Sequence, residues 1–274
     1  MYKVYPKIIL ACLLLVMTGT VYSQRVTQTI NDGWKFSLFE GDASTADFDI
    51  SGWTDVSIPH TWNAKDADDE IPGYFRGKGW YRKVVAVEEL IPEQRVYLSF
   101  EGANQETNVF VNGTFVGNHK GGYSAFTFDV TDYVHAGRNL IAVSVDNSHN
   151  PDIAPLSADF TFFGGIYRDV YLVYTSPVQL STTHYASSGV YLKASKITDL
   201  QADISVKTFL SNALKSNQSL ILETEILDAD GNRVALSAKK VNVKAGEKNV
   251  ACEALMTIAQ PKRWDVDSPY LYKV

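Results

Sequence analysis

Aromatic and polar side chains that suit sugar recognition gather in segments that have the composition of loops. These segments are IPHTWNAKDADD, GYFRGKGWYRK and NSHNPDIAPLSADFTFFGG. The flat face of Trp or Tyr matches the C–H face of a sugar ring, while Asn, Asp and Arg offer hydrogen bonds to its hydroxyl groups. We therefore take Trp62, Asn63 and His149 as candidate sugar contacts. For Trp62, Trp80 and Tyr81 a structural role at the edge of a β-sandwich is an equally supported alternative.

Two adjacent glycines stand at the start of a run that otherwise has the alternation of a half-buried strand, FFGGIYRDVYL. Gly164 and Gly165 predict a tight turn whose backbone lies close to a neighbouring segment. The pair Arg168 and Asp169 is expected to satisfy each other or nearby carbonyl groups at the edge of the strand.

Other kinds of chemistry have weaker support in the sequence. The five histidines include no pair at metal-ligand spacing, and the acidic run from Asp66 to Glu70 lacks the regular spacing of a calcium loop. We see no G-x-S-x-G elbow, phosphate loop or dinucleotide fingerprint, and Cys252 in a strand-like run predicts a buried, inert thiol. Two carboxylates for glycosidic bond cleavage cannot be singled out from sequence spacing. The sequence itself therefore indicates no catalytic residue, metal site or cofactor.

The first 23 residues have the layout of a secretory signal peptide. Lys3 and Lys7 precede a short apolar run, and small or polar residues follow it up to Ser23. A lipoprotein signal that uses Cys12 is the rival, but the apolar run continues past this residue. We expect a mature N-terminus at Gln24 and a periplasmic or secreted protein. The net charge of −6 and the lack of a dense basic cluster argue against nucleic acid as a partner.

The rest of the chain predicts an all-β protein of two sandwiches. Period-2 runs bounded by turn residues recur throughout, and Asn112-Gly113 marks the clearest hairpin. A boundary near Pro177 separates residues 24–177 from residues 178–274, which resemble an immunoglobulin-like sandwich without its cysteine pair. The final residues, DSPYLYKV, have the character of a strand that is only beginning, so we expect the second sandwich to lack part of its last strand. The unpaired edge would be prone to association, so a homo-oligomer is an open alternative.

Several motifs in a fixed order carry a family resemblance over residues 31–173. They are NDGWKFSL, WTDVSIPHTWN, GKGWYRK, LSFEGANQETNVFVNGTFVGNHKGGYSAFTFDVTD, NLIAVSVDN and DFTFFGGIYRDVYL. This region resembles the N-terminal sugar-binding domain of glycoside hydrolase family 2, the β-galactosidase and β-glucuronidase family. The resemblance implies a jelly-roll, galactose-binding-like β-sandwich followed by an immunoglobulin-like β-sandwich. In the family a third domain, an (α/β)₈ barrel, carries both catalytic glutamates, and this sequence stops before it.

The resemblance also implies a role for one carboxylate. In the β-galactosidase branch, an Asp six residues before the second glycine contacts the sugar and a sodium ion, and Asp159 occupies that position. Because the surrounding ADFTFF departs from that branch, the sugar contact is the expectation, and sodium or magnesium stays open for the full-length enzyme. The implied reaction is retaining hydrolysis of a terminal β-glycoside. The alternatives are a free-standing carbohydrate-binding module or lectin, and an adhesion-type structural sandwich.

Overall fold

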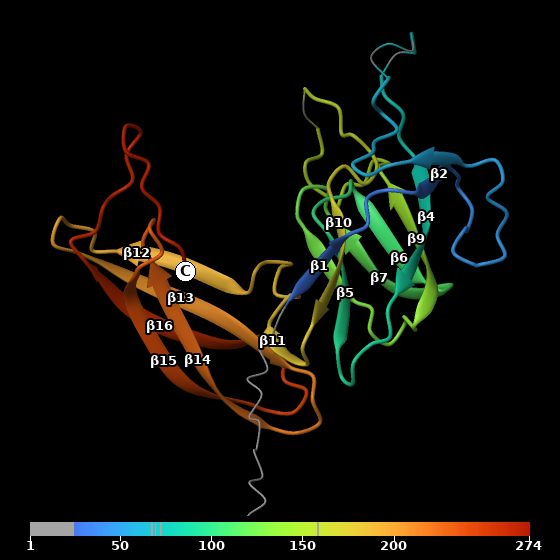
Figure 1. Cartoon of the computed structure of the whole chain (residues 1–274). Helices are drawn as coiled ribbons and strands as arrows, with labels where there is room; N and C mark the ends of the chain where they lie inside the picture. The colour runs from blue at the N-terminus through green and yellow to red at the C-terminus, as the bar shows by residue number, and fades with distance from the viewer. Residues whose placement is uncertain (1–24, 67, 69, 72, 158) are drawn as a thin grey trace, which may run out of the picture.

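A computed structural model describes residues 25–274 apart from residues 67, 69, 72 and 158. The described chain consists of strands, turns and loops, which confirms the all-β prediction (Figure 1). In this part of the chain no helix is long and apolar enough to cross a bilayer. The predicted signal peptide, residues 1–23, lies outside the described residues.

The first sandwich packs a six-stranded sheet against a four-stranded sheet. The order is β3-β2-β4-β9-β6-β7 in the larger sheet and β1-β10-β5-β8 in the smaller one. Alternate residues of the two sheets meet in a core around Trp34, Tyr81, Phe100 and Ile141, each at most 1% exposed. The strands are β1 Val26–Thr29, β2 Trp34–Leu38, β3 Thr54–Val56, β4 Lys78–Val87, β5 Arg95–Phe100, β6 Glu106–Val111, β7 Thr114–Lys120, β8 Phe126–Asp129, β9 Gly137–Asp146 and β10 Val170–Thr175.

Turn chemistry in the first sandwich follows the sequence closely. Asn112 and Gly113 have φ angles of 52° and 80°, which is the left-handed geometry of the predicted two-residue hairpin turn between β6 and β7. The Asp129 carboxylate accepts a hydrogen bond from the Thr131 amide at 3.2 Å, so the turn after β8 is held by a local side chain. The φ angles of Asn112 and Gly113 confirm the predicted hairpin.

The second sandwich is smaller and more open. Strand β13 pairs with β16 on one side and with β12 and β11 on the other, and the separate β14–β15 hairpin lies beside β16. Its core joins Val206, Ile226, Ala254, Met256 and Ile258. The strands are β11 Val178–Leu180, β12 Val190–Ser195, β13 Gln201–Asn212, β14 Gln218–Leu227, β15 Arg233–Val243 and β16 Val250–Ala259.

Two further expectations for the second sandwich can be compared with the structure. Cys252 is a free, buried thiol, as predicted. At the end of the chain, Lys273 forms an isolated antiparallel bridge with Leu227 of β14, and the incomplete last strand stays a prediction.

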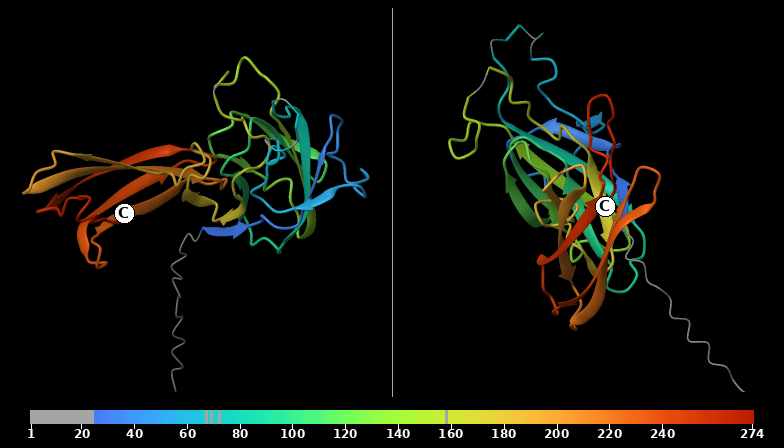
Figure 2. Two further views of the ribbon diagram at one scale, coloured as in Figure 1. Left: turned by 90° about the horizontal axis from the view of Figure 1, so that it is seen from above. Right: turned by 90° about the vertical axis from the view of Figure 1, so that its left-hand side faces the viewer.

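The two sandwiches lie side by side (Figure 2), and the second one contacts the outer face of the four-stranded sheet. Gln179 of β11 donates a hydrogen bond to the hydroxyl of Tyr97 on β5, and the Arg25 guanidinium donates one to the Leu180 carbonyl at 2.9 Å. Tyr97 is only 5% exposed, although it points away from the core of its own sandwich. The second sandwich therefore covers one part of this sheet face.

Candidate functional site

Two long segments of the first sandwich project together from one end of it. Residues 57–77 join β3 to β4, and residues 147–165 belong to the connection from β9 to β10. Both segments rise above the sheets at the top of Figure 1, and we call this region the loop end. Because β4 and β9 are paired neighbours, the segments leave the same edge of the core side by side. All four predicted site residues lie in these two segments: Trp62, Asn63, His149 and Asp159.

A pair of buried asparagines joins the two segments. The Asn147 carbonyl oxygen accepts a hydrogen bond from the Gly77 amide at 2.9 Å, and its amide group donates to the Phe162 carbonyl at 3.1 Å. Asn63 accepts from the Gly164 amide at 2.6 Å and donates to the Phe75 carbonyl at 2.8 Å. Both asparagines are at most 3% exposed. Loop backbone that has left the sheets is therefore satisfied by buried amide side chains.

The two glycines allow this close approach, which confirms their predicted role. A Cβ atom on Gly164 would lie 2.1 Å from the Trp62 ring, and one on Gly165 would lie 2.7 Å from the His60 carbonyl oxygen. Gly165 also has a φ of 118°, a region that side chains disfavour. Its backbone exchanges two hydrogen bonds with Asn104. Any larger residue at either position would push the two segments apart.

A histidine at the base of the loop end is held in its neutral form. The His60 Nδ1 atom lies 2.7 Å from the hydroxyl of Tyr81, and the ring packs against Phe36 with 4.6 Å between centroids. Burial lowers the pKa of His60, because the imidazolium form would lose its hydration. Burial also raises the pKa of Tyr81, so its hydroxyl stays protonated and can donate. The pair is a fixed support rather than an exposed acid or base.

Aromatic side chains bind the outer parts of the two segments together. The Arg76 guanidinium lies 4.9 Å from the Tyr74 ring centroid and 5.2 Å from that of Phe162. Phe162 in turn meets Phe160 edge to face at 5.3 Å. Several apolar side chains at the loop end are nevertheless exposed by 45% or more, and these are Ile71, Phe75, Leu156, Phe160 and Phe163. Exposed apolar groups gathered at one end mark a surface suited to a further partner or ligand.

The four predicted site residues divide into two kinds. Asp159 and His149 are exposed, and the Asp159 carboxylate makes no hydrogen bond or ion pair with another described residue. The amide of Asn63 is used within the chain, and Trp62 stacks on Phe36 at 5.9 Å. The structure therefore presents the first two to solvent, while it uses the other two to hold the loop end. No described contact joins Asp159 to His149.

The structure also distinguishes the two roles considered for Trp62, Trp80 and Tyr81, a sugar contact or a structural role. Trp80 is 3% exposed and Tyr81 is fully buried, so both have a structural role, in the interior and not at the expected edge of the sandwich. Trp62 is half-buried, and its indole N–H has no hydrogen-bond partner among the described residues. The expected contact between the Arg168 and Asp169 side chains does not form. The Asp169 carboxylate instead accepts hydrogen bonds from Asn31 and Tyr171.

Sequence reasoning missed two of the residues that hold the loop end, Asn147 and Asn104. Asn147 follows a buried strand directly, and Asn104 lies in a loop where it donates to the Phe163 carbonyl at 3.0 Å. A buried polar residue placed where a strand gives way to a long loop is the signal that could have pointed to Asn147. Within the described ranges, no three His, Cys, Asp or Glu side chains come together at metal-binding distances. Asp159 is the one residue that the resemblance assigns to an ion.

Comparison with known proteins gives a family match for each of the two sandwiches. Residues 27–177 match the family model described as glycosyl hydrolases family 2, sugar binding domain, and residues 187–274 match the model described as glycosyl hydrolases family 2. A β-glucuronidase of Bacteroides fragilis is 34% identical over 267 residues, which cover 95% of this chain and 36% of that protein. A β-galactosidase of Thermoanaerobacter pseudethanolicus is 36% identical over 259 residues, covering 91% of this chain and 31% of the relative.

A solved structure agrees with these matches. The crystal structure of a Bacteroides uniformis β-glucuronidase superimposes with a TM-score of 0.85 and 37% sequence identity. The superposition covers 91% of this chain and 30% of the solved chain. The chain spans about a third of the length of the curated relatives it matches, and it corresponds to their N-terminal β domains.

Proposed function

The chain belongs to glycoside hydrolase family 2, and we propose that its two sandwiches are the non-catalytic N-terminal part of a β-glycosidase. The observation that carries this proposal is the order of the two family matches, sugar-binding domain first, over residues 27–177 and 187–274. The proposed reaction of the whole enzyme is hydrolysis of a terminal β-glycoside with retention of configuration. That reaction needs one carboxyl group as acid and base and a second as nucleophile. We assign both to the barrel that follows these domains in the family.

The loop end is the part of this chain that we propose to meet the sugar. Asp159 stands on a segment that Asn147 and Phe162 tie to the neighbouring loop, so its exposed carboxylate is carried on an anchored support. A carboxylate that accepts from a sugar hydroxyl forms a charge-assisted hydrogen bond. His149, on the same segment, is a second exposed candidate for a sugar contact. Asn63 and Trp62 contribute by positioning, because their side chains are engaged within the loop end.

The test compares two lengths of protein. The chain alone should not hydrolyse nitrophenyl β-glucuronide or β-galactoside, whereas the chain joined to its downstream barrel should hydrolyse one of them. Turnover by the purified chain, abolished by a single Asp or Glu substitution within it, would overturn the proposal. A barrel-containing protein with no glycosidase activity would overturn the assigned reaction.

A free-standing carbohydrate-binding module or lectin is the second candidate. The exposed aromatic and polar side chains of the loop end favour it, since such groups bind sugars without any chemistry. This candidate predicts saturable binding of a simple β-glycoside at the loop end of the chain alone. If Asp159 acts only together with a barrel, the chain alone should not bind that glycoside there.

Export is part of the same proposal. We propose that residues 1–23 direct the protein to the periplasm or the medium and are then removed. Intact-mass measurement of the exported protein should give an N-terminus at Gln24. A retained Met1 would contradict this.

A further inference from the structure

A groove runs along the junction of the two sandwiches, away from the loop end. One cavity, of about 410 Å³, lies between the outer face of the four-stranded sheet and the segment Thr182–Ser187. A second, of about 510 Å³, adjoins it, because Ala125, Thr127 and Ala186 line both. Cavities of this size at a domain junction are common sites for small ligands. We call the two cavities together the junction groove.

The floor of the first cavity is a row of hydroxyl groups. Tyr171, Ser99 and Thr127 are register partners on β10, β5 and β8, so they stand side by side at the strand spacing of about 4.8 Å. The Ser99 and Thr127 hydroxyl oxygens lie 2.9 Å apart, and the Tyr171 hydroxyl donates to the Asp169 carboxylate at 2.9 Å. Donation to that carboxylate raises the pKa of Tyr171 to about 12. Vicinal hydroxyl groups of a sugar ring can exchange hydrogen bonds with such a row.

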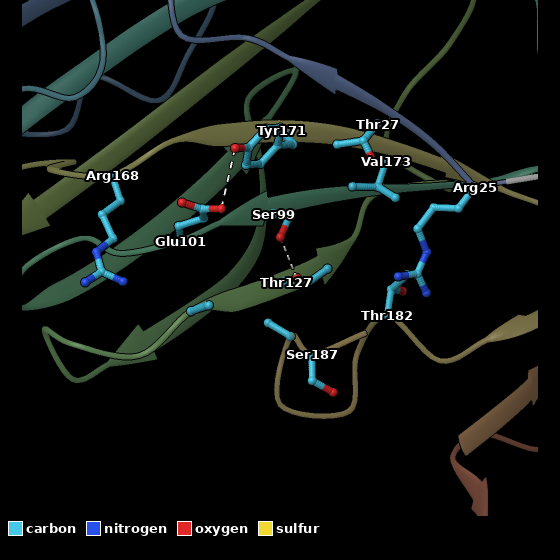
Figure 3. Close-up of a pocket in the computed structure, with 12 residues that line it drawn as sticks. Arg25, Thr27, Ser99, Glu101, Thr127, Arg168, Tyr171, Val173, Thr182 and Ser187 are labelled. Carbon is cyan, nitrogen blue, oxygen red and sulfur yellow. Dashed lines mark hydrogen bonds between the residues drawn. The ribbon is translucent and has the colours of Figure 1, made fainter. Parts of the chain in front are cut away.

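Charge is distributed unevenly along the groove. Figure 3 shows Arg168 at one end of the first cavity and Arg25 at the other, with Glu101 between them. Apart from lying over the Tyr167 ring, the Arg168 guanidinium makes no hydrogen bond or ion pair with another described residue. The residues that line this cavity thus carry two guanidinium groups and the one carboxylate of Glu101, and the Asp169 carboxylate lies beside the cavity on the Tyr171 hydroxyl. A guanidinium presents a planar fork of donors that matches a carboxylate.

The second cavity is neutral and aromatic. Tyr185 is 84% exposed beside it, and His184 stacks on Phe209 with 3.6 Å between ring centroids. Asn118 and Asn249 contribute amide groups to the same wall. Tyr185 has a φ of 52°, so the backbone turns sharply where this ring is presented. An exposed ring beside planar amides suits the stacking and hydrogen bonding of a sugar unit.

From these observations we propose that the junction groove binds a β-linked oligosaccharide that carries a carboxylate, with a uronate unit at Arg168 and a further sugar unit against Tyr185. This site uses residues of both sandwiches and does not depend on the loop end or on the proposed hydrolysis. It requires the arrangement at the junction, because Ser99, Thr127 and Arg168 come from the first sandwich and Tyr185 from the second.

The test is isothermal titration of the two-domain chain with two matched ligands. A β-1,4-linked mannuronate tetrasaccharide and β-1,4-linked mannotetraose differ only in carrying a carboxylate or a hydroxymethyl group on each ring. The mannuronate should bind with a Kd of about 1 mM or lower, and mannotetraose at least about five-fold more weakly. The preference should shrink as salt is added, because the guanidinium is solvent-exposed.

Single substitutions locate the site. Arg168→Gln should remove the preference for mannuronate, while Arg138→Gln, an exposed arginine at the start of β9, should leave it unchanged. Tyr185→Asn should lower the affinity for both tetrasaccharides about five-fold. Asn is chosen because it tolerates the left-handed backbone and so keeps the turn. Phe115→Ala, which removes a half-exposed ring from the β6–β7 hairpin, should have no effect. Circular dichroism on each variant verifies that the fold is kept.

Three results would overturn the proposal. They are the absence of saturable binding of either tetrasaccharide up to about 10 mM, equal affinity for the two ligands, and binding that survives both Arg168→Gln and Tyr185→Asn unchanged.

Discussion

The side-chain oxygen of Asn63 accepts a hydrogen bond from the backbone amide of Gly164 at 2.6 Å, across 101 residues of sequence. This one contact links the β3–β4 and β9–β10 connections at the point where both have left the sheets. Gly164 can approach only because it has no side chain, and Trp62 lies over the same position. The loop end is therefore fixed from inside the domain, and its exposed side chains project from a braced support.

Removal of the Asn63 side chain should destabilise the first sandwich. Asn63→Ala leaves the buried Gly164 amide without its partner, and such a loss costs about 2 to 3 kcal/mol in the free energy of unfolding. The measurement is denaturant unfolding of the two-domain chain. Asn118→Ala removes an amide from the exposed surface of β7 and should change stability by less than about 0.5 kcal/mol. Equal effects of the two substitutions would contradict the bracing role.

Gly164→Ala should destabilise by crowding the Trp62 ring. The added methyl group would lie 2.1 Å from a ring carbon, which predicts a loss of about 2 kcal/mol or more. In a Trp62→Leu background the same substitution should cost at least about 1 kcal/mol less, as a double-mutant cycle would measure. Gly52→Ala is the control, because nothing lies within 4 Å of its added atom. Additive effects of Gly164→Ala and Trp62→Leu would show that the two residues are not coupled.

The substitution Asp159→Asn distinguishes two roles of Asp159, a sugar contact and a local turn residue. In the barrel-containing enzyme it should lower kcat/KM about ten- to a hundredfold, because a charge-assisted hydrogen bond is worth about 1.5 to 3 kcal/mol. The melting temperature should stay unchanged, since the carboxylate has no partner among the described residues. Asp152→Asn, on the same segment, is the matched control. A lower melting temperature with unaltered kinetics would make Asp159 a structural residue.

Stability should fall in mild acid because of His60. Burial lowers its folded-state pKa, so the unfolded chain binds the proton more readily. Full stability is expected above the ordinary histidine pKa of about 6.5, with a loss as the pH falls from there through the lower folded-state value. His60→Gln should make the unfolding free energy less dependent on pH between about 7.5 and 5.5. His119, whose pKa is also lowered by burial, should account for part of the remaining slope. A variant profile with the same slope as the wild type would exclude His60 as a contributor.

Strands and tight turns of this protein were predictable because their signals are local. The Asn112–Gly113 turn and the alternation of the neighbouring strands depend on residues that are adjacent in sequence. Gly164 and Gly165, which precede β10, also correctly predicted that the backbone there lies close to a neighbouring segment. The partner in that approach could not be predicted, since Trp62 comes from a connection about a hundred residues earlier.

The candidate site was harder to predict than the fold. Residue type favoured Asn63 and Trp62 as sugar contacts, but type alone does not tell a solvent-facing amide from one that satisfies a buried backbone. Asn147 shows the same limit, because its role depends on two long segments that meet only after β4 and β9 pair. The junction groove could not be predicted at all, since its walls come from both sandwiches.

The pairing of β1 with β10 has a consequence for how the protein is made. Val26–Thr29 pairs with residues 171–174, so the first strand of the described chain finds its partner only at the far end of the same sandwich. During synthesis β1 must therefore wait until about 145 further residues have left the ribosome, and β5 likewise has β10 as a late neighbour. The six-stranded sheet can assemble earlier from hairpins and nearer strands. Closure of the smaller sheet is thus a late, long-range event that leaves β1 unpaired while the rest of the sandwich is being translated.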